Sequence, residues 1–290
     1  MDFEQLAEGQ WFEGIAVDGE TVWYSDVFAG GIRRYPPEGA DTVWRKNDRW
    51  IGALMMNADG KVLSGGATGI EWFDPASGAS GMLIDSIDGE AIPGVNEMVA
   101  DASGALYFGT VDSAAFERGD PPGPSALYRL DPGGKLNRLT GDLKFSNGLA
   151  LSPDGKHLYH CESWVGVFGY DVAEDGKLGE PSLVCEKADC DGLKVDVDGR
   201  LWIAGFRSPE LLIVSPDGSV YDSYALPGKA ATNHHFGGSD GRDIYISVVI
   251  PVAVDDPSGV EVPAEMKSGL WRGRAPVAGL KLYRPQFELG

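Results

Sequence analysis

Acidic and amide side chains recur at one position of a repeating unit, and their types suit a hard divalent cation. Glu13, Asn147 and Asp191 are each followed by glycine, and Asn96 and Asn233 occupy the same place in two other units. Carboxylate and amide oxygens are preferred ligands of Ca²⁺, Mg²⁺ and Mn²⁺. Two carboxylates would offset the charge of such an ion, whereas their burial without one would be costly. The pattern therefore predicts a divalent cation site.

Six turns mark the repeating unit. Asp-Gly, or once Ser-Gly, stands between a short apolar strand and an aromatic-rich one at 18–19, 59–60, 103–104, 154–155, 198–199 and 240–241. Glycine accepts the positive φ that such hairpin turns need. Counting back seven residues from five of these turns reaches the polar positions above, or Gly52 in the second unit. This shared register argues against the alternative that Asn-Gly and Asp-Gly are merely turns at strand starts.

The units predict an all-β fold. Each spans roughly 45 residues and contains a second strand pair, which is the size of a four-stranded propeller blade. Radial closure would protect the strand edges. We therefore expect one domain over residues 1–290, a six-bladed β-propeller with four antiparallel strands per blade and the first strand of each blade beside the channel. A β-sandwich, the main alternative, does not predict six evenly spaced units.

Charge and composition exclude several classes of partner. The chain has 44 Asp and Glu residues against 24 Lys and Arg, a net charge of −20, so nucleic acids and anionic membrane surfaces are disfavoured. Three cysteines argue against a disulfide framework. The start MDFEQLAEGQ has no basic region or apolar core of a signal peptide. We expect a cytoplasmic protein that acts on a small molecule.

Several motifs resemble the family of senescence marker protein (regucalcin), gluconolactonases and related lactone hydrolases. The most specific are SNGLALSPDGKHLY and CDGLKVDVDGRLW, supported by FEGIAV, GVNEMVADASGALYFGT and HHFGGSDGRDIYIS. The resemblance implies one divalent metal held by Glu13, Asn147 and Asp191, with Asn96 binding water or substrate. Ca²⁺ is the first expectation, and Zn²⁺, Mn²⁺ and Mg²⁺ are alternatives. The metal would polarise a lactone or ester carbonyl, while Asp191 or a neighbouring acid takes a proton.

The chain departs from the family pattern at positions that bear on the substrate. Gly94 stands where sugar-lactone members carry an Arg that contacts substrate, Glu97 stands where an Asp is usual, and Cys190 replaces a common Pro. His234 and His235 replace small or apolar residues. The resemblance therefore predicts the fold and the metal site of this chain more firmly than it predicts a sugar acid lactone as the substrate.

Further candidate residues follow from these positions. Glu97 and His234 join Asp191 as candidate catalytic groups. Asn233 and Trp11 join Asn96 as candidate substrate-binding residues, because Trp11 precedes Glu13 and could line an apolar pocket. Strand alternation sends one of the paired histidines toward the channel mouth, and the structural alternative for His234 is packing between blades.

The sequence predicts a metal-dependent hydrolase that opens a lactone or a similar cyclic ester. Two alternatives stay open: a non-catalytic propeller that binds Ca²⁺ or a small molecule, and different chemistry on the same metal site, such as dehydration or isomerisation. The Pro/Gly-rich insertion at 114–124 is expected to be a lid or a contact loop.

Overall fold

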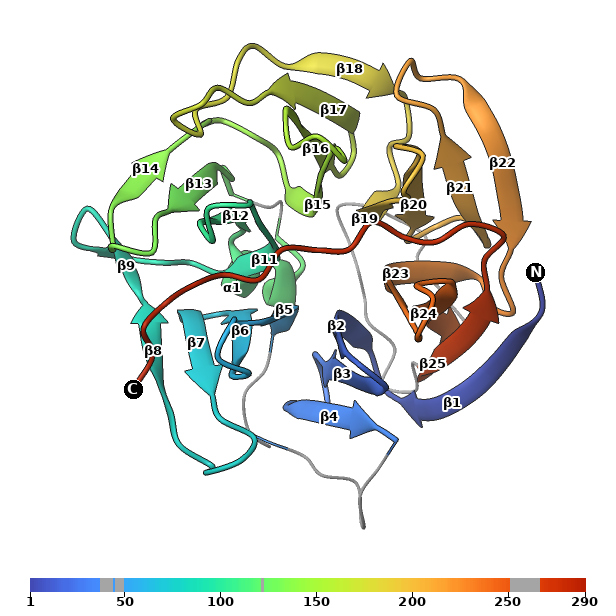
Figure 1. The fold of residues 1–290 in the computed structure, drawn as a ribbon, viewed down its shortest axis with the longest axis horizontal. Coiled ribbons are helices and arrows are strands. Elements are labelled where there is room, and N and C mark those ends of the chain that lie inside the picture. The colour runs from blue at the N-terminus through green and yellow to red at the C-terminus, as the bar shows by residue number, and fades with distance from the viewer. Residues whose placement is uncertain (37–43, 45–49, 121–122, 251–266) are drawn as a thin grey trace.

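Six antiparallel sheets are arranged radially around a central channel (Figure 1). This computed structural model describes residues 1–36, 44, 50–120, 123–250 and 267–290. The inner strand of each sheet contacts the inner strands of both neighbours, which closes the ring. These inner strands are β2 (Phe12–Asp18), β5 (Ile51–Met56), β11 (Val95–Ala100), β15 (Ser146–Leu151), β19 (Cys190–Val195) and β23 (Ala230–Gly237). The prediction of an all-β, six-bladed propeller is confirmed.

Five blades have four strands, and the first has three within the described residues. The middle strands are β3 (Thr21–Asp26), β6 (Val62–Gly66), β7 (Gly69–Phe73), β12 (Leu106–Thr110), β13 (Leu127–Leu130), β16 (His157–Glu162), β17 (Gly166–Asp171), β20 (Leu201–Gly205), β21 (Glu210–Val214), β24 (Asp243–Ile250) and β25 (Lys267–Arg274). The outer strands are β4 (Ile32–Tyr35), β8 (Ser80–Ile84), β14 (Leu136–Arg138), β18 (Ser182–Cys185), β22 (Val220–Ala225) and β1 (Phe3–Gly9). A short hairpin of β9 (Ser86–Ile87) and β10 (Glu90–Ala91) precedes β11.

The N-terminal strand β1 completes the last blade. Its sheet has the order β1-β25-β24-β23, with Phe3 opposite Gly273 and Gly9 opposite Ser268. The first and last strands of the described chain, β1 and β25, thus pair in one sheet and close the ring. The sequence repeats did not predict this, because β1 lies before the first turn signal and has no repeat of its own.

The six turn signals are confirmed as hairpins between the first and second strands of the blades. Their glycines have φ values from 60° to 87°. They are Gly19, Gly60, Gly104, Gly155, Gly199 and Gly241.

Every inner strand has an irregularity of the β-bulge type against its neighbour, and it falls at the predicted channel position. The register shifts lie between Phe12 and Ile15, Ile51 and Ala53, Val95 and Glu97, Ser146 and Leu149, Cys190 and Leu193, and Ala231 and His234. A bulge adds a residue to one strand and re-aims its side chain. The repeated bulge therefore directs the polar residue of five blades away from the regular pleat; the second blade has Gly52 at this position.

Glycine after the polar residue lets adjacent inner strands approach closely. A Cβ atom on Gly148 would lie 2.4 Å from the Asp191 carbonyl oxygen. A Cβ atom on Gly192 would lie 2.5 Å from Oδ1 of Asn233. Both contacts are too short for a real side chain, which explains the Asn-Gly and Asp-Gly pairs at these positions.

The hydrophobic core lies between neighbouring blades. Val99 and Tyr107 of one blade pack with Leu149 and Leu158 of the next, and comparable clusters fill other interfaces. No helix among the described residues is long and apolar enough to cross a bilayer.

The C-terminal segment 276–290 crosses the end of the channel where the inner strands finish (Figure 1, red). The backbone N–H of Leu280 donates to the Val195 carbonyl at 2.8 Å, and that of Gln286 donates to the Gly104 carbonyl at 3.1 Å. The segment therefore ties different blades together across this face.

Gly192→Ala should lower the free energy of unfolding by about 1–3 kcal/mol, because the added methyl group overpacks the contact between β19 and β23. Chemical denaturation monitored by tryptophan fluorescence would measure the change. Gly133→Ala is the matched control, since nothing lies within 4 Å of its Cβ position. Equal stability of the two variants would contradict the close-packing explanation.

Candidate active site

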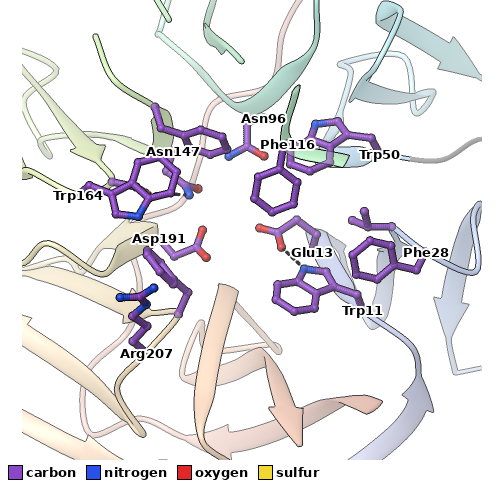
Figure 2. A pocket seen from close by; sticks show the side chains of 14 residues that line it. Trp11, Glu13, Phe28, Trp50, Asn96, Phe116, Asn147, Trp164, Asp191 and Arg207 are labelled. Atoms are coloured by element: carbon purple, nitrogen blue, oxygen red, sulfur yellow. Dashed lines mark hydrogen bonds between the residues drawn. The ribbon is translucent and has the colours of Figure 1, made fainter. Parts of the chain in front are cut away.

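A pocket opens at the end of the channel where the inner strands begin. Glu13, Asn96, Asn147 and Asp191 line it, each from a different blade, together with Trp11. Figure 2 shows the carboxyl groups of Glu13 and Asp191 pointing into this space. The structure thus brings together all three predicted metal ligands and two of the predicted substrate-binding residues.

Glu13 is oriented by an indole, and that indole is positioned by a buried acid. Nε1 of Trp11 donates to Oε2 of Glu13 at 2.9 Å. Asp26, which is fully buried, accepts from the backbone N–H groups of Gln10 at 3.0 Å, Trp11 at 3.1 Å and Ala29 at 3.0 Å. Asp26 therefore fixes both chain segments that carry this side of the pocket. Sequence reasoning missed it, although it ends the aromatic strand TVWYSD.

The amide groups are oriented with their nitrogens turned toward the protein. Nδ2 of Asn147 donates to Oγ of Ser163 at 3.2 Å, and that hydroxyl donates to the Cys190 carbonyl at 2.7 Å. Nδ2 of Asn96 donates to the Ser146 carbonyl at 3.2 Å. Because the nitrogens are engaged, the amide oxygens are the atoms left to bind a ligand.

The environment of the two pocket carboxyl groups disfavours their charged forms. Burial raises the pKa of Glu13 to about 8; the Trp11 hydrogen bond opposes this rise, and the charge of Glu97 adds to it. Burial raises the pKa of Asp191 well above its usual range, and the charge of Glu13 adds to the effect. Oδ1 of Asp191 is buried and has no hydrogen-bond partner among the described residues.

This donor set fits a hard divalent cation. Two carboxylates and two amide oxygens are suitable ligands, and a cation between them would favour the charged form of both acids. The unpartnered Oδ1 of Asp191 supplies a buried acceptor that a cation would satisfy. In the described parts of the chain, no group of three or more His, Cys, Asp or Glu side chains forms a metal site, so a site here depends on the amide oxygen of Asn147 in addition to the two carboxylates.

Aromatic rings form most of the remaining pocket wall. Five of them follow one another in an arc, with centroid distances of 4.7, 6.0, 5.1 and 6.3 Å. In order they are Trp50, Phe116, Phe145, Trp164 and Phe206. Trp11 and Phe28 form a further pair at 5.7 Å. Sequence reasoning identified Trp11 and Trp164 here and missed the other rings of the arc, because those residues come from loops and from the insertion helix, which have no repeat signals.

Phe116 lies on the helix α1 (Ser113–Arg118), which forms the first part of the insertion predicted at 114–124. Residues 121 and 122 of that insertion lie outside the described residues. Gly94 lies beside the loop leading to α1, and a Cβ atom there would lie 2.8 Å from the Val111 carbonyl oxygen. Its φ of 154° also disfavours a side chain. The structure therefore has no room at this position for the arginine that the family resemblance leads us to expect there.

Three predicted site residues do not line the pocket. Glu97 and Asn233 are buried in the channel, where Oε2 of Glu97 accepts from Nδ2 of Asn233 at 3.0 Å and from Nζ of Lys194 at 3.3 Å. Glu97 and Lys194 line a second cavity toward the opposite end of the inner strands. Sequence reasoning missed Lys194, three residues after Asp191 on β19.

His234, the third of these residues, is fully buried beside Phe236, with ring centroids 6.4 Å apart. Neither of its ring nitrogens has a hydrogen-bond partner in the described structure. His235 lines the second cavity instead, and its Nδ1 lies 2.7 Å from the Phe236 carbonyl oxygen. The two histidines thus face different environments, as strand alternation predicts, but neither lines the pocket that holds Glu13 and Asp191.

A buried histidine supports the strand that carries Asn147. Nε2 of His160 lies 3.0 Å from Oγ of Ser146, and burial lowers the pKa of His160 to about 3. The ring is therefore neutral in the folded protein near pH 7.

Known proteins resemble this chain over most of its length. The model of the SMP-30/Gluconolactonase/LRE-like region matches residues 11–250. The 6-deoxy-6-sulfogluconolactonase of Pseudomonas putida is 28% identical over 238 residues, 80% of each chain. The L-arabinolactonase of Azospirillum brasilense is 29% identical over 215 residues, 71% of this chain and 70% of that one. The structure of a calcium-binding protein, regucalcin, from Agrobacterium tumefaciens has a TM-score of 0.75 at 20% identity, covering 98% of this chain and 95% of that one.

Acid should destabilise the protein through His160. Its folded-state pKa lies below the unfolded value of about 6.5, so the unfolded state binds the extra proton, and stability falls as the pH drops from about 6.5 toward 3. One such group contributes a slope of about 1.4 kcal/mol per pH unit. Denaturant titrations between pH 7 and 4 should show a flatter dependence for His160→Gln. An unchanged slope would contradict a neutral buried ring.

Proposed function

The chain belongs to the SMP-30/Gluconolactonase/LRE-like family, and from this premise we propose that it is a metal-dependent hydrolase that opens a lactone or similar cyclic ester of a small molecule. The observation that carries the proposal is the convergence of Glu13, Asn147 and Asp191 in one pocket, with a buried Oδ1 of Asp191 that lacks a partner among the described residues. The names of the relatives from P. putida and A. brasilense support ring opening of a lactone.

In this proposal Glu13, Asn147 and Asp191 hold one divalent cation through oxygen atoms. Ca²⁺ is the first choice, because the donors are hard oxygens and the similar structure from A. tumefaciens is that of a calcium-binding protein. When bound, the cation would supply Lewis-acid polarisation of the substrate carbonyl. Trp11 keeps Glu13 directed at the site, and Ser163 keeps the amide of Asn147 turned so that its oxygen is available.

The chain's own groups bind the substrate and move the proton. During hydrolysis the oxygen of a water molecule forms a bond to the carbonyl carbon, the ring C–O bond breaks, and the product is a hydroxy acid. We assign Asp191 as the group that accepts the proton of this water through the carboxyl oxygen that does not hold the cation, because Asp191 is a carboxyl group in the pocket. The proton then passes to the ring oxygen that the C–O cleavage releases. Asn96 orients the substrate from the neighbouring wall. Glu97 and His234 receive no proton-transfer role here, because neither lines the pocket.

Metal binding should depend on the two pocket carboxylates. We expect one Ca²⁺ per chain in the native protein and at least about 100-fold weaker binding in Glu13→Gln and Asp191→Asn, since each loses a charged ligand. Isothermal titration calorimetry and elemental analysis would measure this. Glu180→Gln removes an exposed acid outside the pocket and should bind normally. Wild-type affinity in both pocket variants would contradict the assigned ligands.

Activity should require the cation and add one water to the substrate. Protein loaded with Ca²⁺, Zn²⁺, Mn²⁺ or Mg²⁺ should open members of a varied lactone panel, and mass spectrometry should detect the hydroxy acid. Asp191→Asn should lower kcat by about 100-fold or more, because it removes the proton acceptor. Turnover without a mass change would indicate isomerisation, and metal binding with no turnover would indicate a binding protein.

A further inference from the structure

We propose that the lactone carries an apolar alkyl or aryl substituent rather than a hydroxylated sugar chain. This inference rests on the proposed lactone hydrolysis and adds the substrate class. It depends on the wall of the pocket rather than on the predicted metal ligands.

The apolar wall is continuous and built from rings in contact. Trp50 and Phe116 pack edge to face at 4.7 Å, and Phe145 and Trp164 do so at 5.1 Å. Phe206 extends the arc beyond Trp164, with ring centroids 6.3 Å apart. Aromatic surfaces of this kind bind alkyl chains and rings by removing apolar area from water.

Few polar groups of the pocket remain for substrate hydroxyl groups. Among the described lining residues, three polar side chains are the proposed metal ligands. The hydroxyl of Ser163 already connects Asn147 to the Cys190 carbonyl. Asn96 and the exposed Arg207 are the two polar lining side chains left besides the indole groups. The N–H groups of Trp50 and Trp164 have no partner in the described structure, but both nitrogens are buried and do not reach the pocket surface. A polyhydroxylated substituent would therefore bury hydroxyl groups without partners, which disfavours its binding.

The position of Phe116 is fixed in advance by the fold. Oδ1 of Asp112 accepts from the Ala115 N–H at 2.8 Å at the start of α1, and Gly119 ends the helix with φ 72°. The loop before the helix is tied to the neighbouring segment, because Oγ of Ser113 donates to the Pro93 carbonyl at 2.8 Å. A preformed wall of this kind binds an apolar group without the cost of ordering a loop.

A set of δ-lactones that share one six-membered ring tests this inference. The panel is δ-valerolactone, δ-decalactone, δ-phenyl-δ-valerolactone and glucono-δ-lactone, each with metal-loaded protein. We expect kcat/KM for the pentyl- and phenyl-substituted lactones to exceed that for glucono-δ-lactone by about 100-fold or more, and that for unsubstituted δ-valerolactone by about tenfold.

Phe116→Ala should lower kcat/KM for δ-decalactone by about tenfold and leave that for δ-valerolactone nearly unchanged, because only the substituent reaches the ring. Phe206→Ala, at the other end of the arc, is a second variant in case the first does not fold. Phe168→Ala removes a partly buried phenylalanine outside the pocket and should behave like the native protein.

The outcomes separate this inference from the proposed function. Equal or faster opening of glucono-δ-lactone, or an equal loss on all lactones in Phe116→Ala, would overturn the apolar substrate class while lactone hydrolysis stands. Failure to open any lactone, δ-valerolactone included, would overturn both.

Discussion

Six inner strands converge on one axis. Neighbouring strands can approach this closely only where one of them has a residue without a side chain at the contact. At Gly148 and Gly192 the next inner strand lies so close that a single methyl group would collide with it. The bulge at the same level of every inner strand turns the preceding polar side chain out of the pleat. One geometric requirement therefore brings oxygen-bearing side chains from separate blades to a common level, and the sequence meets it with Asn-Gly and Asp-Gly.

The chemistry of the pocket follows from the burial that this convergence imposes. Burial raises the pKa of both Glu13 and Asp191, and the charge of Glu13 further disfavours the charged form of Asp191. A protein that only needed packing at this point would place neutral groups there, since paired buried acids oppose folding. Deeper in the channel, Lys194 offsets the charge of Glu97 through a direct contact. Among the described residues, neither Glu13 nor Asp191 forms an ion pair with a cationic side chain, although Arg207 lines the same pocket. This contrast with Glu97 favours a divalent cation as the counterion of the two pocket acids.

The sequence predicted the parts of the molecule that repeat. The turn glycines predicted the blades, and the register counted from them predicted Asn147 and Asp191 as equivalent positions. Glu13 was matched to them by the glycine that follows it, and all three line one pocket. It did not place Glu97 relative to that pocket, because a bulge inserts a residue and breaks the simple alternation of neighbouring side chains. It also missed the arc around Phe116, since loop residues have no period to count. Such positions are set by tertiary contacts, which for Phe116 are the hydrogen bonds that hold α1 in place.

The pairing of β1 with β25 has a consequence for synthesis of the chain. Phe3 leaves the ribosome about 270 residues before its partner Gly273, which at roughly 5–20 residues per second is an interval of about 15 to 50 seconds. During that time the strand has no edge to join, and its unpaired N–H and C=O groups are open to other partners. The ring can therefore close only after β25 has been synthesised, whereas a propeller whose blades are each continuous in sequence can complete every blade as its own strands emerge.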